Sequence, residues 1–171
     1  MLITAASCNK LVESVFPGED ITLGELVVTV PPIPFADSTF EFPAGTFTIY
    51  INTDSVIRAT TAGVFGINSV SSVKVKQITM SVLNADSDNN LSAFKSFRIA
   101  ISSNTQTNPQ DILQIDIPAT AFDSYTATAI DSPDITAYLQ GTSITYTVYG
   151  RVRSTTTKTL NISSTVVVTA K

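Results

Sequence analysis

The sequence predicts an all-β protein: an antiparallel, immunoglobulin-like β-sandwich of about seven to eight strands with one or two short helices. Segments in which apolar and polar residues alternate recur along the chain, and loops rich in Ser, Thr, Asn and Asp separate them. Thr, Ser, Val and Ile dominate the composition, as in half-buried strands. A closed barrel is the alternative architecture.

The clearest strand pair covers residues 73–83 and 94–103, which the polar loop NADSDNNLSA connects. In the first strand the apolar phase changes between Val75 and Ile78. A shift of one residue would turn every side chain to the other face, so we expect a β-bulge near Lys76 and Gln77. The alternative is that the first two valines face a different neighbour.

Two further strands precede this pair. Residues 21–30 change phase at Gly24, where we expect a second bulge, and the prolines that follow end the strand. Residues 40–51 form a strand interrupted at 43–45, which indicates either a hairpin or a bent corner.

Two short helices are expected. Asp54 is the predicted N-cap of the first, which Gly63 ends. Ser132, followed by a proline and an aspartate, starts the second, which Gly141 ends. The remaining strands are expected over residues 113–117, 122–129, 144–152 and 160–169.

Size and composition favour a single folded domain. The chain has 171 residues, of which 43% are hydrophobic and 14% charged. We expect an N-terminal tether over residues 1–20 and one sandwich domain over residues 21–171. The net charge of -4 includes no basic block, which argues against nucleic acid as a partner. No apolar run reaches the ~20 residues of a membrane-spanning helix.

Missing residue types argue against an enzyme. The chain has one cysteine, no histidine and no tryptophan. It therefore lacks the commonest general base, the commonest transition-metal ligand and the strongest stacking platform. It also contains no Gly-x-Ser-x-Gly elbow and no phosphate-binding glycine loop. We expect neither a cofactor nor catalysis.

The N-terminus suggests a lipid anchor. Residues 5–7 are small, Cys8 follows them, and Asn9 and Lys10 come next. This stretch resembles the lipobox of bacterial lipoproteins, and its Ser-Cys-Asn-Lys form is similar to outer-membrane lipoproteins of the Bacteroidota. Residues 71–103 also look like an uncharacterised sandwich domain of such lipoproteins.

The resemblance implies that Cys8 is lipidated and becomes the mature N-terminus, so that Met1 is an internal start. Several acyl chains would hold the domain stably at the outer membrane. Surface-exported members of this group tend to carry acidic residues after the cysteine. Only Glu13 is acidic here, which favours the periplasmic face; an extracellular location is the alternative.

Two groups of residues are candidate binding sites. Asp86, Asp88 and Asn90 are spaced like the start of a calcium loop, although Leu91 and Phe97 stand where an EF-hand needs glycine and glutamate. The alternative is a solvated loop that uses Asp and Asn as turn formers.

The second group comprises Arg98, Tyr149, Arg151 and Arg153. If their strands adjoin, they form a basic, aromatic patch that suits an acidic protein partner or a sugar acid. The alternative is that outward cations keep the sheet soluble and discourage edge pairing.

Four acids crowd one third of the chain: Asp116, Asp123, Asp131 and Asp134. A pair of carboxylates at the correct separation can hydrolyse glycosides without histidine. The alternative places Asp134 at a helix start and Asp116 on the solvent face of a strand.

Three functions follow from these observations. The first is a non-catalytic, lipid-anchored domain of the cell envelope that binds or scaffolds a protein or glycan. The second is a self-assembling subunit of an extracellular filament, built by strand exchange. The third is a hydrolase that works without histidine.

Overall fold

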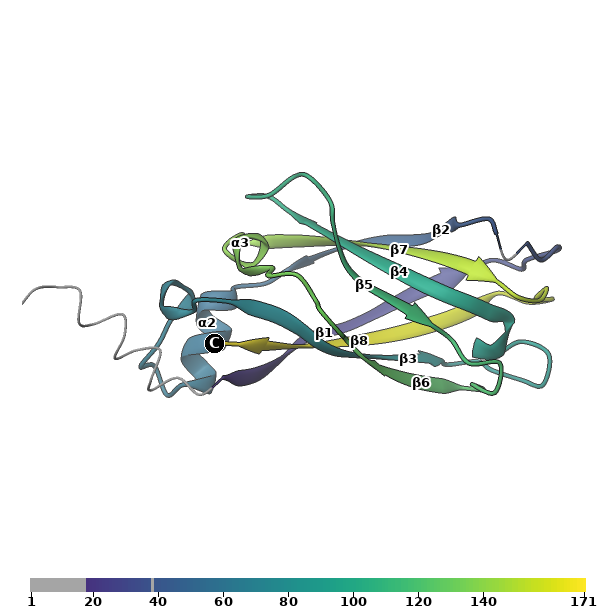
Figure 1. Ribbon diagram of the computed structural model, residues 1–171, viewed down its shortest axis with the longest axis horizontal. Helices are drawn as coiled ribbons and strands as arrows, with labels where there is room; N and C mark the ends of the chain where they lie inside the picture. Colours follow the sequence, from purple (N-terminus) through teal and green to yellow (C-terminus); the bar gives the residue numbers. More distant parts are fainter. Residues whose placement is uncertain (1–17, 38) are drawn as a thin grey trace, which may run out of the picture.

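Two four-stranded antiparallel sheets pack face to face in the computed structural model, which describes residues 18–37 and 39–171 (Figure 1). The strands are β1 (Glu19–Val30), β2 (Phe42–Tyr50), β3 (Val73–Val82), β4 (Phe94–Ser103), β5 (Gln110–Asp116), β6 (Ser124–Thr128), β7 (Ser143–Val152) and β8 (Leu160–Ala170). One sheet has the order β1-β8-β3-β6 and the other β2-β7-β4-β5. The predicted sandwich is confirmed, and its two separate sheets do not form the closed barrel that was the alternative.

The strands pair as one long hairpin wrapped on itself. β1 pairs with β8, β2 with β7, β3 with β6 and β4 with β5, all antiparallel. Two more pairings, β3 with β8 and β4 with β7, complete the sheets. This connectivity is that of a jelly roll. The sequence analysis predicted the sandwich but no strand order, because alternation identifies buried faces but not strand partners.

Both predicted bulges are confirmed. The register of β3 against β8 shifts between Val75 and Gln77, and that of β1 shifts across Gly24, whose φ is 95°. Only glycine adopts such a φ without strain. The interruption in the next strand is also a bulge, between Pro43 and Gly45, so β2 bends but continues.

The core lies between the sheets and contains the inward residues of every strand except β6, whose Tyr125 and Ala127 pack against its edge. Tyr146 on β7 is the largest fully buried side chain. Burial raises the pKa of its phenol, whose oxygen has no hydrogen-bond partner among the described residues.

The first helix, α2 (Thr53–Thr60), is confirmed, but its predicted cap is wrong. The side-chain oxygen of Asn52 caps it by accepting from the Ser55 N–H at 2.9 Å. Asp54 lies in the first turn instead and pairs with Arg58 at 2.6 Å.

The second helix, α3 (Thr136–Leu139), starts later than predicted. The Ser132 hydroxyl accepts from the Val75 N–H at 3.0 Å, and Asp134 accepts from the Val73 N–H at 3.1 Å. Ser132 therefore fastens the segment to β3 and does not cap the helix, whereas Asp134 also accepts from the N–H of Thr136, the first residue of α3, at 2.9 Å. Two single-turn 3-10 helices, η1 (Ile67–Ser69) and η2 (Leu91–Ala93), complete the elements.

Within the described residues, no helix is both long and apolar enough to cross a membrane. The predicted lipidation site, Cys8, lies outside the described residues. β1 begins at Glu19, so the last two residues of the predicted tether, residues 1–20, lie in a strand.

Candidate functional site

The strongest polar cluster lies on the outer face of the β2-β7-β4-β5 sheet. Arg98 Nη2 lies 2.6 Å from Glu41 Oε2, and Arg98 Nη1 lies 2.6 Å from Asp111 Oδ1. The guanidinium carbon stands 3.9 Å from the centre of the Tyr149 ring. We call these four residues the Arg98 clasp. Because they come from β4, β5, β7 and the residue before β2, the clasp ties the whole width of the sheet together.

The two carboxylates of the clasp neutralise its single cation, Arg98. The hydrogen bonds from Arg98 hold the pKa of Glu41 below its usual range, although partial burial opposes this. The same bonds to Glu41 raise the pKa of the Arg98 guanidinium. The planar guanidinium donates to both carboxylates, so its capacity to hold an external anion is already used.

The structure divides the predicted basic patch. Arg98, Tyr149 and Arg151 share the outer face of one sheet, and Arg151 forms no ion pair with another described residue.

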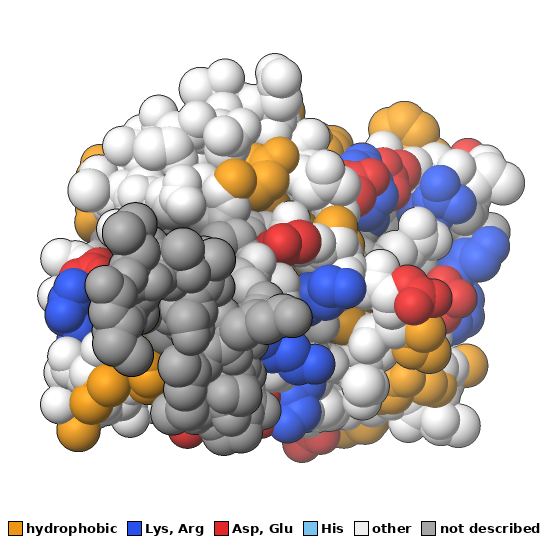
Figure 2. Space-filling model, turned by 60° about the vertical axis from the view of Figure 1, so that its left-hand side comes forward, with side chains coloured by type: hydrophobic (Ala, Val, Ile, Leu, Met, Phe, Trp, Pro, Cys, Tyr) orange, Lys and Arg blue, Asp and Glu red, His pale blue; other side chains and the backbone are white. Residues whose placement is uncertain are grey.

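Arg153, the residue after β7, binds backbone carbonyls at the end of the sandwich. It donates to the carbonyls of Ser92 at 2.8 Å, Phe94 at 3.0 Å and Ile117 at 2.7 Å, which joins two loops to β7. On the face drawn in Figure 2, acidic and basic side chains lie beside one another and do not form separate fields.

The candidate calcium loop is held by its own hydrogen bonds. Asp86 Oδ1 accepts from the backbone N–H of Asp88 at 3.0 Å and of Asn89 at 2.9 Å, and Oδ2 lies 2.5 Å from Lys158 Nζ. The Lys158 bond is the largest cause that lowers the pKa of Asp86. Asn90 is buried and caps the following 3-10 turn. These contacts favour the turn interpretation over a cation site.

The four crowded acids have separate surroundings. Asp134 is bound to the backbone of β3, and Asp116 is the exposed last residue of β5. Asp123 precedes β6, whereas Asp131 lines a groove beyond its other end. Within residues 18–37 and 39–171, no three His, Cys, Asp or Glu side chains are grouped closely enough to hold a metal ion.

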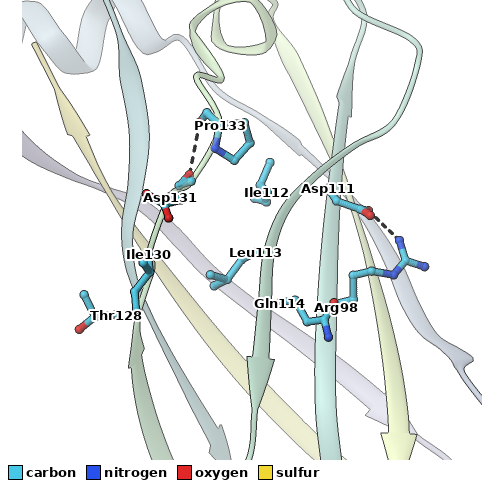
Figure 3. A pocket seen from close by; sticks show the side chains of 10 residues that line it. Arg98, Asp111, Ile112, Leu113, Gln114, Thr128, Ile130, Asp131 and Pro133 are labelled. Carbon is cyan, nitrogen blue, oxygen red and sulfur yellow. Dashed lines mark hydrogen bonds and ion pairs between the residues drawn. The ribbon is translucent and has the colours of Figure 1, made fainter. Parts of the chain in front are cut away.

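The groove that Asp131 lines has a volume of about 340 Å³ and lies between β5 and β6 (Figure 3). Ile112, Leu113 and Gln114 line it from β5, while Thr128 and Ile130 line it from the β6 side. The two strands are the unpaired edges of opposite sheets, so the groove follows an open side of the sandwich.

An apolar recess lies at the end of the sandwich where β1 gives way to β2. It encloses about 200 Å³, and among the described residues that line it Asp37 is the only charged one. The lining residues are Val30, Pro31, Pro32, Ile33, Pro34, Phe35, Asp37, Phe40, Phe42, Pro43 and Val152. We call this the Pro-Phe recess.

Two aromatic rings at the Pro-Phe recess face solvent. Phe35 is 71% exposed and Phe40 is 60% exposed. Two hydrogen bonds hold the segment after β1 in place. The Ile33 N–H donates to the Thr156 hydroxyl, and the Thr156 N–H donates to the Ile33 carbonyl, both at 3.0 Å. The sequence analysis did not identify this recess, because it treated the prolines only as the end of a strand.

Comparisons with known proteins do not assign the chain to a family. No family model and no curated protein matches the sequence. The crystal structure of FLHE is similar over 90% of this chain and 97% of that one, with 8% identity and a TM-score of 0.38. A putative secreted protein from Eubacterium rectale is similar over 90% of this chain and 39% of its own, with 11% identity and a TM-score of 0.43. A chain from the structure of the heated, full particle of Israeli acute paralysis virus is similar over 99% of this chain and 79% of its own length, with 8% identity and a TM-score of 0.33.

The Arg98 clasp makes stability depend on pH. Because the folded pKa of Glu41 is lowered, its stabilising effect is present above its unfolded pKa and is lost as the pH falls through its folded pKa. We expect Glu41→Gln to lower the free energy of unfolding by about 1 kcal/mol at pH 7, a value discounted for partial exposure. In urea unfolding, the difference from the unmodified protein should shrink as the pH falls below the usual glutamate pKa.

Asp116→Asn is the matched control, since this exposed carboxylate on the same sheet forms no ion pair with a described residue. It should change stability little at either pH. A Glu41→Gln effect that persists unchanged at pH 2 would contradict a role for the ion pair.

Proposed function

We propose that this chain is a non-catalytic binding domain of the cell envelope, held at the outer membrane through a lipid on Cys8, which binds a protein partner at the Pro-Phe recess. The observation that carries the proposal is the recess itself, where exposed aromatic rings border an apolar hollow. Exposed apolar surface of this kind marks interaction sites, and concave apolar pockets are the usual form of binding sites.

The chemistry of the recess favours an apolar segment of a protein over a glycan. Sugar hydroxyls need several polar groups to replace water, and the described lining offers one charged group, Asp37. That carboxylate already accepts from the N–H of Thr39 at 2.9 Å and from its hydroxyl at 2.6 Å. An aliphatic, aromatic or proline side chain of a partner matches the hollow in size and polarity.

The position of the recess fits an anchored domain. Gly18, where the described chain begins, lies beside Thr169 and the C-terminal Lys171. The Pro-Phe recess lies at the other end of β1, so β1 separates it from the start of the described chain (Figure 1). A tether at the N-terminus would therefore present the recess away from the membrane.

The recess is testable with a hydrophobic dye. We expect the double variant Phe35→Ser, Phe40→Ser to bind 1-anilinonaphthalene-8-sulfonate at least about threefold less than the unmodified protein, because it removes the exposed apolar surface. Tyr50→Ser combined with Val64→Ser is the matched control, since it removes two exposed apolar side chains elsewhere. Equal dye fluorescence from both double variants would contradict a binding role for the recess.

The anchor is testable separately. We expect the chain, expressed in a diderm bacterium behind its own upstream reading frame, to fractionate with the outer membrane and to carry an acylated N-terminal cysteine by mass spectrometry. Cys8→Ser should release it from that fraction. An unacylated Cys8, or the same distribution for both forms, would rule out the lipid anchor while leaving the recess untouched.

A further inference from the structure

β6 is the least protected of the four edge strands. A strand at a sheet edge offers unpaired N–H and C=O groups to other chains, and bulges, prolines and charges normally block this. β1 has a bulge and three acids, β2 has a bulge beside Pro43, and β5 has a bulge and two aspartates. β6, with the sequence SYTAT, has a regular register and contains neither proline nor charge.

The hydrogen-bond pattern identifies which backbone groups of β6 are free. The Ala129 N–H donates to the Lys76 carbonyl at 2.8 Å, and the Val82 N–H donates to the Asp123 carbonyl at 2.8 Å. Because antiparallel pairs alternate between bonded and non-bonded, the odd-numbered residues of β6 bond to β3. The even-numbered residues Ser124, Thr126 and Thr128 direct their N–H and C=O groups away from β3.

These free groups are self-complementary. If β6 pairs antiparallel with β6 of another copy, with Thr126 opposite Thr126, then Ser124 lies opposite Thr128. In this register the even-numbered residues form the bonded pairs, and Tyr125 opposite Ala127 forms the non-bonded pairs between them. No charged residue of β6 opposes another, and Tyr125 lies opposite the small Ala127.

The flanking residues support the same register. Phe122 and Ile130 lie four residues on either side of Thr126 and are 50% and 85% exposed. The two-fold pairing brings Phe122 of one copy to the same end as Ile130 of the other, where their apolar surfaces can pack. The groove between β5 and β6 leaves this side of β6 uncovered.

We propose that β6 is a self-association edge, through which two copies join the β1-β8-β3-β6 sheets into one continuous sheet about a two-fold axis at Thr126. An isologous contact of this kind closes after two copies and does not propagate into a filament. Because only five residues of each strand pair, the interface is smaller than a standard one, and we expect weak association that requires concentrated protein. The inference is independent of what occupies the Pro-Phe recess.

Cross-linking tests the register. In the full chain with Cys8→Ser, so that no other cysteine remains, Thr126→Cys should form a disulfide-linked dimer under mild oxidation. Bonded antiparallel residues stand about 5.5 Å apart at Cα, within disulfide range. Ser124→Cys is the matched control, because the two copies of this residue lie ~13 Å apart along the strands. Cross-linking of Ser124→Cys equal to that of Thr126→Cys, or none with Thr126→Cys, would overturn the register.

Sedimentation velocity tests the association itself. Thr126→Lys places two like charges on the axis and should weaken dimerisation at least about tenfold. Thr48→Lys is the matched control on the other sheet: each threonine is exposed, and each hydroxyl lies 2.9 Å from that of a cross-strand threonine. It should dimerise like the Cys8→Ser protein. Circular dichroism checks that both variants fold. If Thr126→Lys does not fold, the cross-linking experiment still tests the proposal.

A monomer at all concentrations up to about 1 mM would overturn the proposal. So would equal association by the two lysine variants.

Discussion

Backbone pairing between strands that are distant in the chain holds this protein together. β8, the last strand, lies between β1 and β3, and β7 lies between β2 and β4. Neither sheet is complete until the C-terminal third of the chain has joined it. Closing such long loops costs conformational entropy before the contacts form, so we expect slow, cooperative folding. The interior that results is formed by the inward residues of both sheets and leaves charged groups at the surface.

The charged residues reinforce these long-range pairings. The Arg98 clasp spans the width of one sheet, and Arg153 joins two loops to β7. Asp134 fastens the segment before α3 to β3. Three side chains that the sequence marked as candidates for binding or catalysis, Arg98, Arg153 and Asp134, are thus engaged in holding the fold. We propose two recognition surfaces: the apolar Pro-Phe recess and the free backbone groups of the β6 edge.

Local features of the fold were predictable from the sequence, whereas long-range ones were not. The change of apolar phase around Gln77 and at Gly24 predicted both bulges, because a bulge is the local way to restore an inward set. The jelly-roll order was not predictable, since alternation carries no information about partners. Ser132 was misassigned for a related reason: a cap residue and a residue that binds a distant strand have the same polar side chain.

In the candidate site, too, local features were predictable from the sequence and long-range contacts were not. Arg98 and Tyr149 were predicted to share a face and do so, but the acids that neutralise Arg98 come from other strands and could not be anticipated. The prolines of the recess were visible in the sequence. Only the fold places them against Phe40 and Val152, which come from later segments of the chain.

Amide hydrogen exchange on a dilute sample tests the strand order most directly. The account predicts the slowest exchange in β3, β4, β7 and β8, each flanked by two strands, and faster exchange in the edge strands β1, β2, β5 and β6. Within β6, the amides of Tyr125 and Ala127 should be protected and that of Thr126 should not. Slow exchange confined to strands that are consecutive in the chain, with β8 unprotected, would contradict the jelly-roll pairing.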